Sequence, residues 1–183
     1  MIIGITGTLG AGKGTIVAYL EQQGFLHLSV RQYLTEEIQK RAMPLDRDSM
    51  VAVANELRAA NGASYIIERL YEQAASGDKD AVIESLRVPA EVAALREKDR
   101  FLLLAVDADR RKRFDRIRLR GSETDDIPFE QFVADEEREM ASEDPNKQNI
   151  RGCIAMADVV IRNDGTIDDL YEEVGDVLMR WQR

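Results

Sequence analysis

The sequence contains one cysteine, one histidine and one tryptophan in 183 residues. A single cysteine cannot form an internal disulfide, and one histidine beside one cysteine cannot supply the ligands of a structural zinc site. These shortages exclude a disulfide-stabilised fold and a zinc-stabilised fold. We therefore expect a reduced, cytoplasmic protein that is stabilised by an ordinary hydrophobic core.

Positive charge is also scarce, because 25 Lys and Arg residues stand against 34 Asp and Glu residues and leave a formal net charge of -9. This deficit disfavours broad electrostatic attraction to nucleic acid or to an anionic membrane. The apolar run Met1 to Thr6 is too short for a signal peptide or a membrane span, and no basic segment precedes it. We expect a small-molecule partner, no nucleic-acid or membrane partner, and a monomer or a homodimer.

Short apolar runs alternate with segments of helical periodicity along the whole chain. This alternation predicts an α/β fold in which helices cover both faces of a parallel sheet, giving three layers. The run Arg100 to Asp107 is apolar nearly throughout, so we expect it to lie in the centre of the sheet beside the first strand. The five expected strands are Met1–Thr6, Phe25–Ser29, the run from Ala81 to Glu84, Arg100–Asp107 and Ala157–Ile161.

A glycine-rich loop joins the first expected strand to the first expected helix. Glycines allow a backbone wrap that aims N–H groups at phosphate oxygens, and Lys13 adds a mobile charge for the outer phosphates. Gly14 follows the lysine, so the hydroxyl that normally binds magnesium is displaced to Thr15. The residues expected to bind the nucleotide phosphates are Gly7, Gly10, Ala11, Gly12, Lys13, Gly14 and Thr15.

The loop resembles that of adenylate kinases and other nucleoside monophosphate kinases, cytidylate kinase included. The resemblance implies ATP as the donor, Mg²⁺ held largely through waters, and phosphoryl transfer to a nucleoside or deoxynucleoside monophosphate. It further implies a single domain over 1–183, with an acceptor-binding helical insert at about 30–78 and a lid at about 121–149. The implied order of the five strands is 2-3-1-4-5. The positions that match are Gly7, Gly10, Gly12, Lys13, Gly14 and Thr15.

An acid and an arginine follow the third expected strand. Open parallel sheets bind ligands at the carboxyl ends of their strands, where Glu84 could hold Mg²⁺ or its waters and Arg87 would face the same cleft. The alternative is that both are ordinary surface charges at a strand end. The segment from Glu84 to Arg87 resembles a shortened Asp-Gly-Phe-Pro-Arg of adenylate kinases, which implies that Glu84 assists the metal and Arg87 grips the acceptor phosphate.

A dense basic run precedes the expected lid. Helical spacing places Arg113, Arg116 and Arg120 on one face, where guanidinium forks suit a triphosphate. The run resembles the helix before the adenylate kinase lid, which implies that Arg116 contacts adenine and Arg120 the outer phosphates. Arg138 would be a cation that the closing lid delivers, although an ion pair within its own helix is the alternative. The expected catalytic residues are Lys13, Arg87, Arg116, Arg120 and Arg138.

The start of the insert departs from the adenylate kinase pattern. Gln32 and Thr35 stand where those kinases carry an aspartate and an arginine, so the identity of the acceptor stays open. Arg31 is a candidate for acceptor binding, and an exposed cation at a helix start is its alternative. Farther on, Asn163 and Gly165 lie in a loop that resembles the base-side loop of monophosphate kinases, which implies that they bind ATP; turn chemistry alone is the alternative explanation of this loop.

Two other functions remain possible from the sequence. One is a dephospho-CoA kinase-like enzyme that acts on a small molecule, although the acid-bearing segment expected after the second strand of such an enzyme is missing. The other is a nucleotide-binding switch that transfers no phosphate. Glu84, Arg87 and the basic run favour an enzyme over a switch. His27 is left out of the expected site because a lone histidine on a strand is usually structural.

Overall fold

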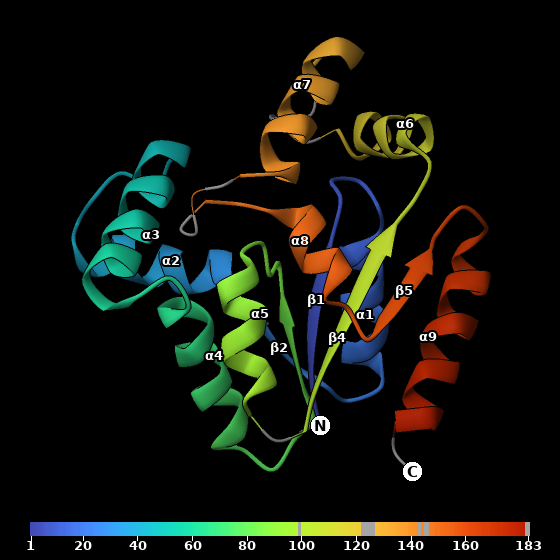
Figure 1. The fold of residues 1–183 in the computed structure, drawn as a ribbon, viewed down its shortest axis with the longest axis horizontal. Helices are drawn as coiled ribbons and strands as arrows, with labels where there is room; N and C mark the ends of the chain where they lie inside the picture. The colour runs from blue at the N-terminus through green and yellow to red at the C-terminus, as the bar shows by residue number, and fades with distance from the viewer. Residues whose placement is uncertain (99, 122–126, 143, 145–146, 182–183) are drawn as a thin grey trace.

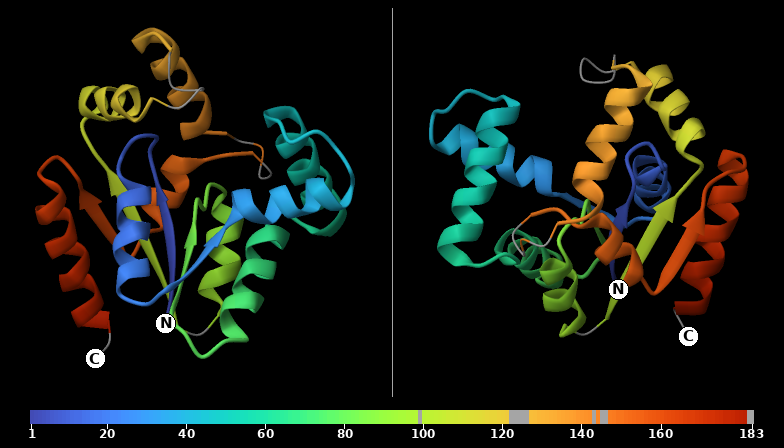
Figure 2. Two further views of the ribbon diagram at one scale, coloured as in Figure 1. Left: turned by 180° about the vertical axis from the view of Figure 1, so that it is seen from behind. Right: turned by 45° about the horizontal axis from the view of Figure 1, so that its top comes forward.

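The sheet at the centre of the molecule consists of five parallel strands in the order β2-β3-β1-β4-β5 (Figures 1 and 2). The structure is a computed structural model, and it describes residues 1–98, 100–121, 127–142, 144 and 147–181. The predicted α/β fold and the predicted strand order are both confirmed. The strands are β1 (Ile2–Gly7), β2 (Leu26–Ser29), β3 (Ala81–Glu84), β4 (Phe101–Asp107) and β5 (Val159–Arg162).

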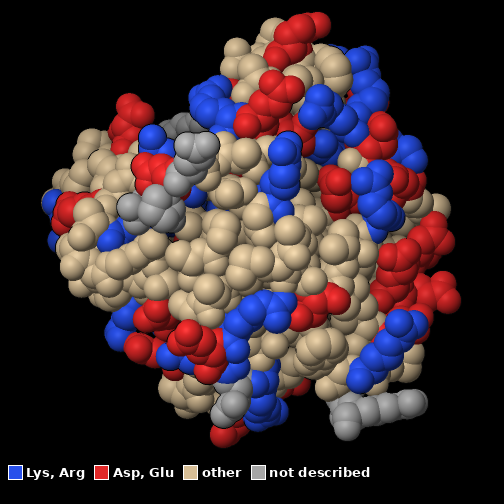
Figure 3. Space-filling view, viewed as in Figure 1, with Lys and Arg blue, Asp and Glu red and all other residues tan. Residues whose placement is uncertain are grey.

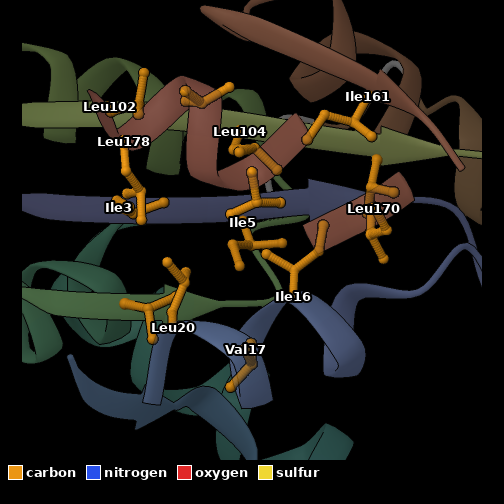
Figure 4. Packing of buried hydrophobic residues seen from close by; sticks show 14 of the residues in the cluster. Ile3, Ile5, Ile16, Val17, Leu20, Leu102, Leu104, Ile161, Leu170 and Leu178 are labelled. Atoms are coloured by element: carbon orange, nitrogen blue, oxygen red, sulfur yellow. The ribbon is translucent and has the colours of Figure 1, made fainter. Parts of the chain in front are cut away.

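Helices cover both faces of this sheet. Because side chains alternate along a strand, Ile3 and Leu104 contact one layer of helices while Ile2 and Leu103 contact the other. Figure 4 shows the first of these two cores, where the side chains of the strands meet those of the helices. Helices α1 (Lys13–Gln22) and α9 (Ile167–Trp181) form one layer, and α4 (Tyr65–Ala75), α5 (Pro89–Arg96) and α8 (Ile150–Ala155) form the other.

Two helical segments extend beyond the sheet, and each has a small hydrophobic cluster of its own. Helices α2 (Val30–Lys40) and α3 (Arg47–Asn61) pack against each other and against α4. Helices α6 (Arg110–Arg120) and α7 (Phe129–Met140) pack around Phe132 and lie above the carboxyl ends of the strands in Figure 1.

Helices α2 and α3 lie within the range expected for the insert, and α7 lies within the range expected for the lid, whereas α6 precedes that range. Their roles as insert and lid stay predictions. Residues 122–126, 143, 145 and 146 of the expected lid lie outside the described residues. No described helix is both long enough and apolar enough to cross a membrane.

Candidate nucleotide-binding site

The glycine loop leaves the carboxyl end of β1 and wraps toward the start of α1. Gly7, Gly10 and Gly12 all have positive φ angles, of 142°, 77° and 107°. A Cβ atom on Gly7 would lie 2.0 Å from the Val106 carbonyl oxygen, so a side chain cannot be accommodated there. Successive residues of this kind form a concave backbone surface that suits anionic oxygens. The loop therefore has the backbone shape that the sequence predicted for phosphate binding.

The side chain of Lys13 folds back over this loop. Its Nζ atom donates hydrogen bonds to the carbonyl oxygens of Gly7 and Thr8, both at 2.8 Å. Burial and, to a lesser extent, the positive charge of Arg87 lower the pKa of Lys13 to about 8, although Glu139 and Glu84 oppose the change. Lys13, Glu84, Arg87 and Glu139 therefore lie close enough to interact electrostatically. A bound phosphate group would stabilise the charged ammonium.

Neighbouring loops brace the glycine loop from the side of β4 and β5. Thr8 Oγ1 donates to Asp107 Oδ1 at 2.6 Å, and Asn163 Nδ2 donates to the Ala11 carbonyl oxygen at 2.7 Å. Gly12 cannot carry a side chain here, because its Cβ would lie 2.4 Å from Asn163 Nδ2. The Asn163 amide is thus engaged with the loop backbone. Sequence reasoning missed Asp107, although its place at the carboxyl end of β4, next to β1, could have indicated it.

Glu84 ends β3 directly beside the glycine-loop strand, since it pairs with Ile5 of β1 and with Ser29 of β2. The Ser29 hydroxyl donates to Glu84 Oε1 at 2.9 Å, and His27 Nε2 lies 3.5 Å from the same oxygen. His27, which was left out of the expected site, is therefore a neighbour of Glu84. Ser85 next to it has a φ of 69°, a left-handed conformation that is unusual for a residue with a side chain.

Arg87 lies where the segment after β3, helix α7 and the segment that leads into α8 meet. Its Nη1 atom donates to Gln148 Oε1 at 3.0 Å and lies 3.5 Å from Glu139 Oε2 of α7. Its backbone is held as well, because its N–H donates to Glu91 Oε2 at 2.9 Å and its carbonyl oxygen accepts from the Asn149 N–H at 2.8 Å. The guanidinium is therefore kept in the region of Lys13 by groups from several elements.

The three arginines expected to share one face of α6 have different surroundings. Arg113 is buried: it donates from Nε to the Ala108 carbonyl oxygen and from Nη1 to the Leu9 carbonyl oxygen, and its Nη2 lies 2.5 Å from Glu136 Oε1. It links α7 to the glycine loop, and it does not present its guanidinium to a triphosphate as the helical spacing suggested. The reason is that α6 packs against the loop backbone at Arg113. The N–H groups of its guanidinium are therefore bound by carbonyl oxygens and by the buried Glu136 carboxylate.

Arg116 lies one turn farther along α6, and Arg120 is exposed at the end of the helix. The Nη1 atom of Arg116 is buried and has no hydrogen-bond partner within the part of the chain that the structure describes. Because buried polar atoms are nearly always paired in folded proteins, this nitrogen is a candidate for contact with a ligand. Figure 3 shows that Lys and Arg side chains gather over α6, whereas Asp and Glu side chains gather along α9.

The comparisons with known proteins agree with this architecture. A family model described as an AAA domain matches residues 3–146. The chain belongs to this AAA-domain family. The UPF0200 protein of Thermococcus onnurineus is 30% identical over 170 residues, which cover 90% of this chain and 89% of that protein. A UPF0200 protein of Thermococcus kodakarensis is 29% identical over 180 residues, which cover 95% of this chain and 94% of that protein.

Solved structures that resemble this AAA-domain protein include kinases. Shikimate kinase from Bacteroides thetaiotaomicron has a TM-score of 0.58 at 14% identity, and 98% of each chain is covered. A gluconokinase from Sinorhizobium meliloti has a TM-score of 0.54 at 15% identity, with 97% of this chain and 91% of that chain covered. At such identities the likeness shows the fold alone. The fold is that of P-loop kinases, which is broader than the adenylate kinase resemblance seen in the sequence.

Three further predicted site residues of this AAA-domain protein have surroundings of their own. The Arg138 side chain is 69% exposed and forms an ion pair with Asp135 in its own helix, which is the kind of pairing given above as the alternative. Arg31 is exposed in the first turn of α2. Gly165 lies beside Asp169, whose carboxylate would be 2.5 Å from a Cβ at that glycine.

The residues expected to hold magnesium have suitable chemistry. Thr15 offers a hydroxyl in the first turn of α1, and Glu84 offers a carboxylate at the end of β3; both supply the oxygen ligands that Mg²⁺ prefers. Among the described residues no three His, Cys, Asp or Glu side chains are grouped so that they could hold a metal ion. This pair fits an ion that keeps several of its waters.

Proposed function

We propose that the protein is an ATP-dependent kinase that transfers the γ-phosphoryl group to a nucleoside or deoxynucleoside monophosphate. The observation that carries this proposal is the meeting of Lys13, Glu84 and Arg87 at the carboxyl ends of β1 and β3, where Arg87 and Glu84 both influence the pKa of Lys13. A nucleotide-binding loop alone needs only the lysine. Transfer of a phosphoryl group between two phosphates also requires an arginine and a carboxylate at the same place, and Arg87 and Glu84 are those residues in this proposal.

The roles we assign follow from the chemistry of each side chain. The glycine loop and Lys13 would hold the donor phosphates, and Thr15 and Glu84 would bind Mg²⁺ or its waters. Arg87 would bind the acceptor phosphate, because a guanidinium offers two parallel donors to phosphate oxygens. ATP would supply the phosphoryl group and Mg²⁺ would neutralise its charge. The protein would contribute positioning and electrostatic stabilisation, with no covalent intermediate on the chain.

The other arginines have supporting roles in this proposal. The buried Nη1 atom of Arg116 has no hydrogen-bond partner among the described residues, which favours contact with ATP, and Arg120 would meet the outer phosphates. Arg138 would reach the site only if α7 moved and its ion pair with Asp135 opened. Arg31 stays a candidate for acceptor binding. Asn163 would contribute chiefly by bracing the glycine loop, and Gly165 would leave room for the base of ATP.

The first test is a screen for acceptors with purified protein, ATP and Mg²⁺. We expect ADP formation that depends on one or a few members of a panel of ribo- and deoxynucleoside monophosphates, with dephospho-CoA included. Lys13→Ala should lower turnover roughly 100-fold or more, as the loss of a transition-state donor does elsewhere. Turnover with dephospho-CoA alone would identify the alternative kinase.

A nucleotide-binding switch predicts a different pattern. It would bind ATP without consuming it in the presence of any acceptor. Hydrogen exchange separates the two cases further, because a kinase should slow exchange over 127–142 most when a non-hydrolysable ATP analogue and the acceptor are both present. Protection confined to Gly7 to Thr15 would support the switch.

A further inference from the structure

A buried carboxylate holds the backbone that carries Arg87. Glu91 lies in the first turn of α5 and is only 1% exposed. Its Oε2 atom accepts hydrogen bonds from the N–H groups of Arg87 at 2.9 Å and Val88 at 3.1 Å. Burial raises the pKa of Glu91, while Arg58 and these two N–H groups oppose the rise. The position of the Arg87 main chain therefore depends on where the Glu91 carboxylate lies.

The second oxygen of this carboxylate is bound from the helical insert. Arg58 of α3 donates from Nη2 to Glu91 Oε1 at 3.2 Å, and the side chains of Arg58 and Glu91 are only 17% and 2% exposed. The Arg58 Nε atom is buried and without a hydrogen-bond partner among the described residues. One carboxylate thus joins the insert to the segment that carries Arg87.

The geometry of this connection can be compared with that of another ion pair in the insert. Arg41 and Glu56 form an ion pair with Nη1 2.8 Å from Oε2, but the Glu56 side chain is 66% exposed and the pair joins the end of α2 to α3. An exposed pair contributes little and is screened by solvent, whereas loss of one partner of a buried pair leaves the other charge uncompensated. The two pairs therefore serve as test and control.

We propose that Arg58 and Glu91 are positioning residues that make the placement of the Arg87 guanidinium depend on the insert. The inference rests on the proposed function, in which Arg87 binds the acceptor phosphate. An acceptor that settles against α2 and α3 shifts the helix that carries Arg58, and Glu91 passes this shift to the backbone of Arg87. Neither Arg58 nor Glu91 needs to touch the acceptor. Affinity for the acceptor, and not affinity for ATP, is the quantity that this pair controls.

The test uses Arg58→Met and Glu91→Gln, singly and together, with Arg41→Met as the matched control. Glu91→Gln keeps a side-chain oxygen for the two backbone N–H groups and removes the charge that Arg58 binds. We expect each single variant to raise the acceptor KM roughly tenfold and to leave the ATP KM unchanged, because a misplaced binding group weakens only the ligand that it holds. The double variant should be no worse than the singles, since both remove one interaction.

Two further measurements separate positioning from a general loss of stability. Arg58→Lys keeps the positive charge and should recover part of the acceptor KM, and Arg41→Met should match the wild type. The N–H groups of Arg87 and Val88 should exchange with solvent at least severalfold faster in Arg58→Met than in Arg41→Met, because Glu91 is no longer held in place.

The outcomes are distinguishable. An unchanged acceptor KM in Arg58→Met, or effects of the two single substitutions that add in the double variant, would overturn the positioning role. A wild-type protein that forms no product with any acceptor would instead refute the proposed function. The exchange measurement then decides the positioning role by itself: equal exchange of the Arg87 and Val88 N–H groups in Arg58→Met and Arg41→Met would overturn it.

Discussion

ATP binding should draw a proton from solution at mildly alkaline pH, because the lysine of the glycine loop is held in surroundings that disfavour its charge. Burial, aided by Arg87, lowers the pKa of Lys13 to about 8. Free protein at about pH 8.5 therefore has roughly one quarter of its Lys13 side chains charged. The phosphate groups of ATP are fully ionised at this pH, and a neighbouring anion favours the ammonium form.

The size of this effect follows from the two protonation states. If bound phosphate returns the pKa of Lys13 to near 10.5, its ordinary value, nearly every Lys13 is charged in the complex. Binding at about pH 8.5 should then take up about 0.7 proton per ATP, whereas binding at about pH 7 should take up only about 0.1. Protons are taken up on binding because the pKa of Lys13 is lowered in the free protein and rises when the phosphates bind.

Isothermal titration calorimetry measures this quantity directly. Titrations of ATP at each pH are repeated in two buffers with different ionisation enthalpies, and the difference in heat gives the number of protons exchanged. A Lys13→Met variant, titrated at protein concentrations high enough to detect weaker binding, should show no uptake at either pH. Uptake near zero at about pH 8.5, with ATP bound by the wild type, would show that Lys13 does not meet the phosphates.

Three other substitutions test separate parts of the site. Glu136→Ala should lower the free energy of unfolding by about 2–3 kcal/mol in urea titrations, since it removes the nearest carboxylate from the buried Arg113 guanidinium and leaves only Asp107 at 3.6 Å. The exposed control Arg138→Ala should change it by less than about 0.5 kcal/mol; similar values for both would contradict the buried link. Arg87→Lys should raise the acceptor KM as Arg87→Ala does, because an ammonium lacks the bidentate fork; wild-type kinetics would refute this. Glu139→Gln should lower the acceptor KM severalfold by removing a carboxylate that competes with phosphate for Arg87, and a higher KM would show that Glu139 supports binding.

Local pattern was sufficient to predict the features that neighbouring residues create. The alternation of apolar runs and helical segments predicted every strand, and the glycine spacing predicted a loop with a backbone wrap that glycine allows, which the structure forms with positive φ angles. The start of α9 carries a signal of the same short range, since Thr166 and Asp169 cap it reciprocally: Asp169 Oδ2 accepts from the Thr166 N–H and Thr166 Oγ1 accepts from the Asp169 N–H. Such signals lie within a few residues, so tertiary packing rarely overrides them.

The pairs that join distant segments could not be predicted in this way. Arg113 and Glu136 meet across two helices, and Arg58 and Glu91 meet across the boundary between insert and sheet. Helical spacing gives the face on which Arg113 lies, but it does not say what packs against that level of the helix. Glu136 belongs to a segment rich in charge and Glu91 to the first turn of a helix, and for a glutamate at either place an exposed position is the usual expectation. Only the assembled fold shows that they are buried.

The central claim is that the γ-phosphoryl group of ATP moves to an acceptor phosphate held by Arg87. A single-turnover reaction with γ-³²P-labelled ATP and a pooled set of nucleoside monophosphates tests this claim most directly. We predict that the label appears in a nucleoside diphosphate with the wild type and that Arg87→Ala slows its appearance strongly while ATP remains bound. Label that stays in ATP, or that appears only as inorganic phosphate, would contradict the assignment of the protein as a nucleotide kinase.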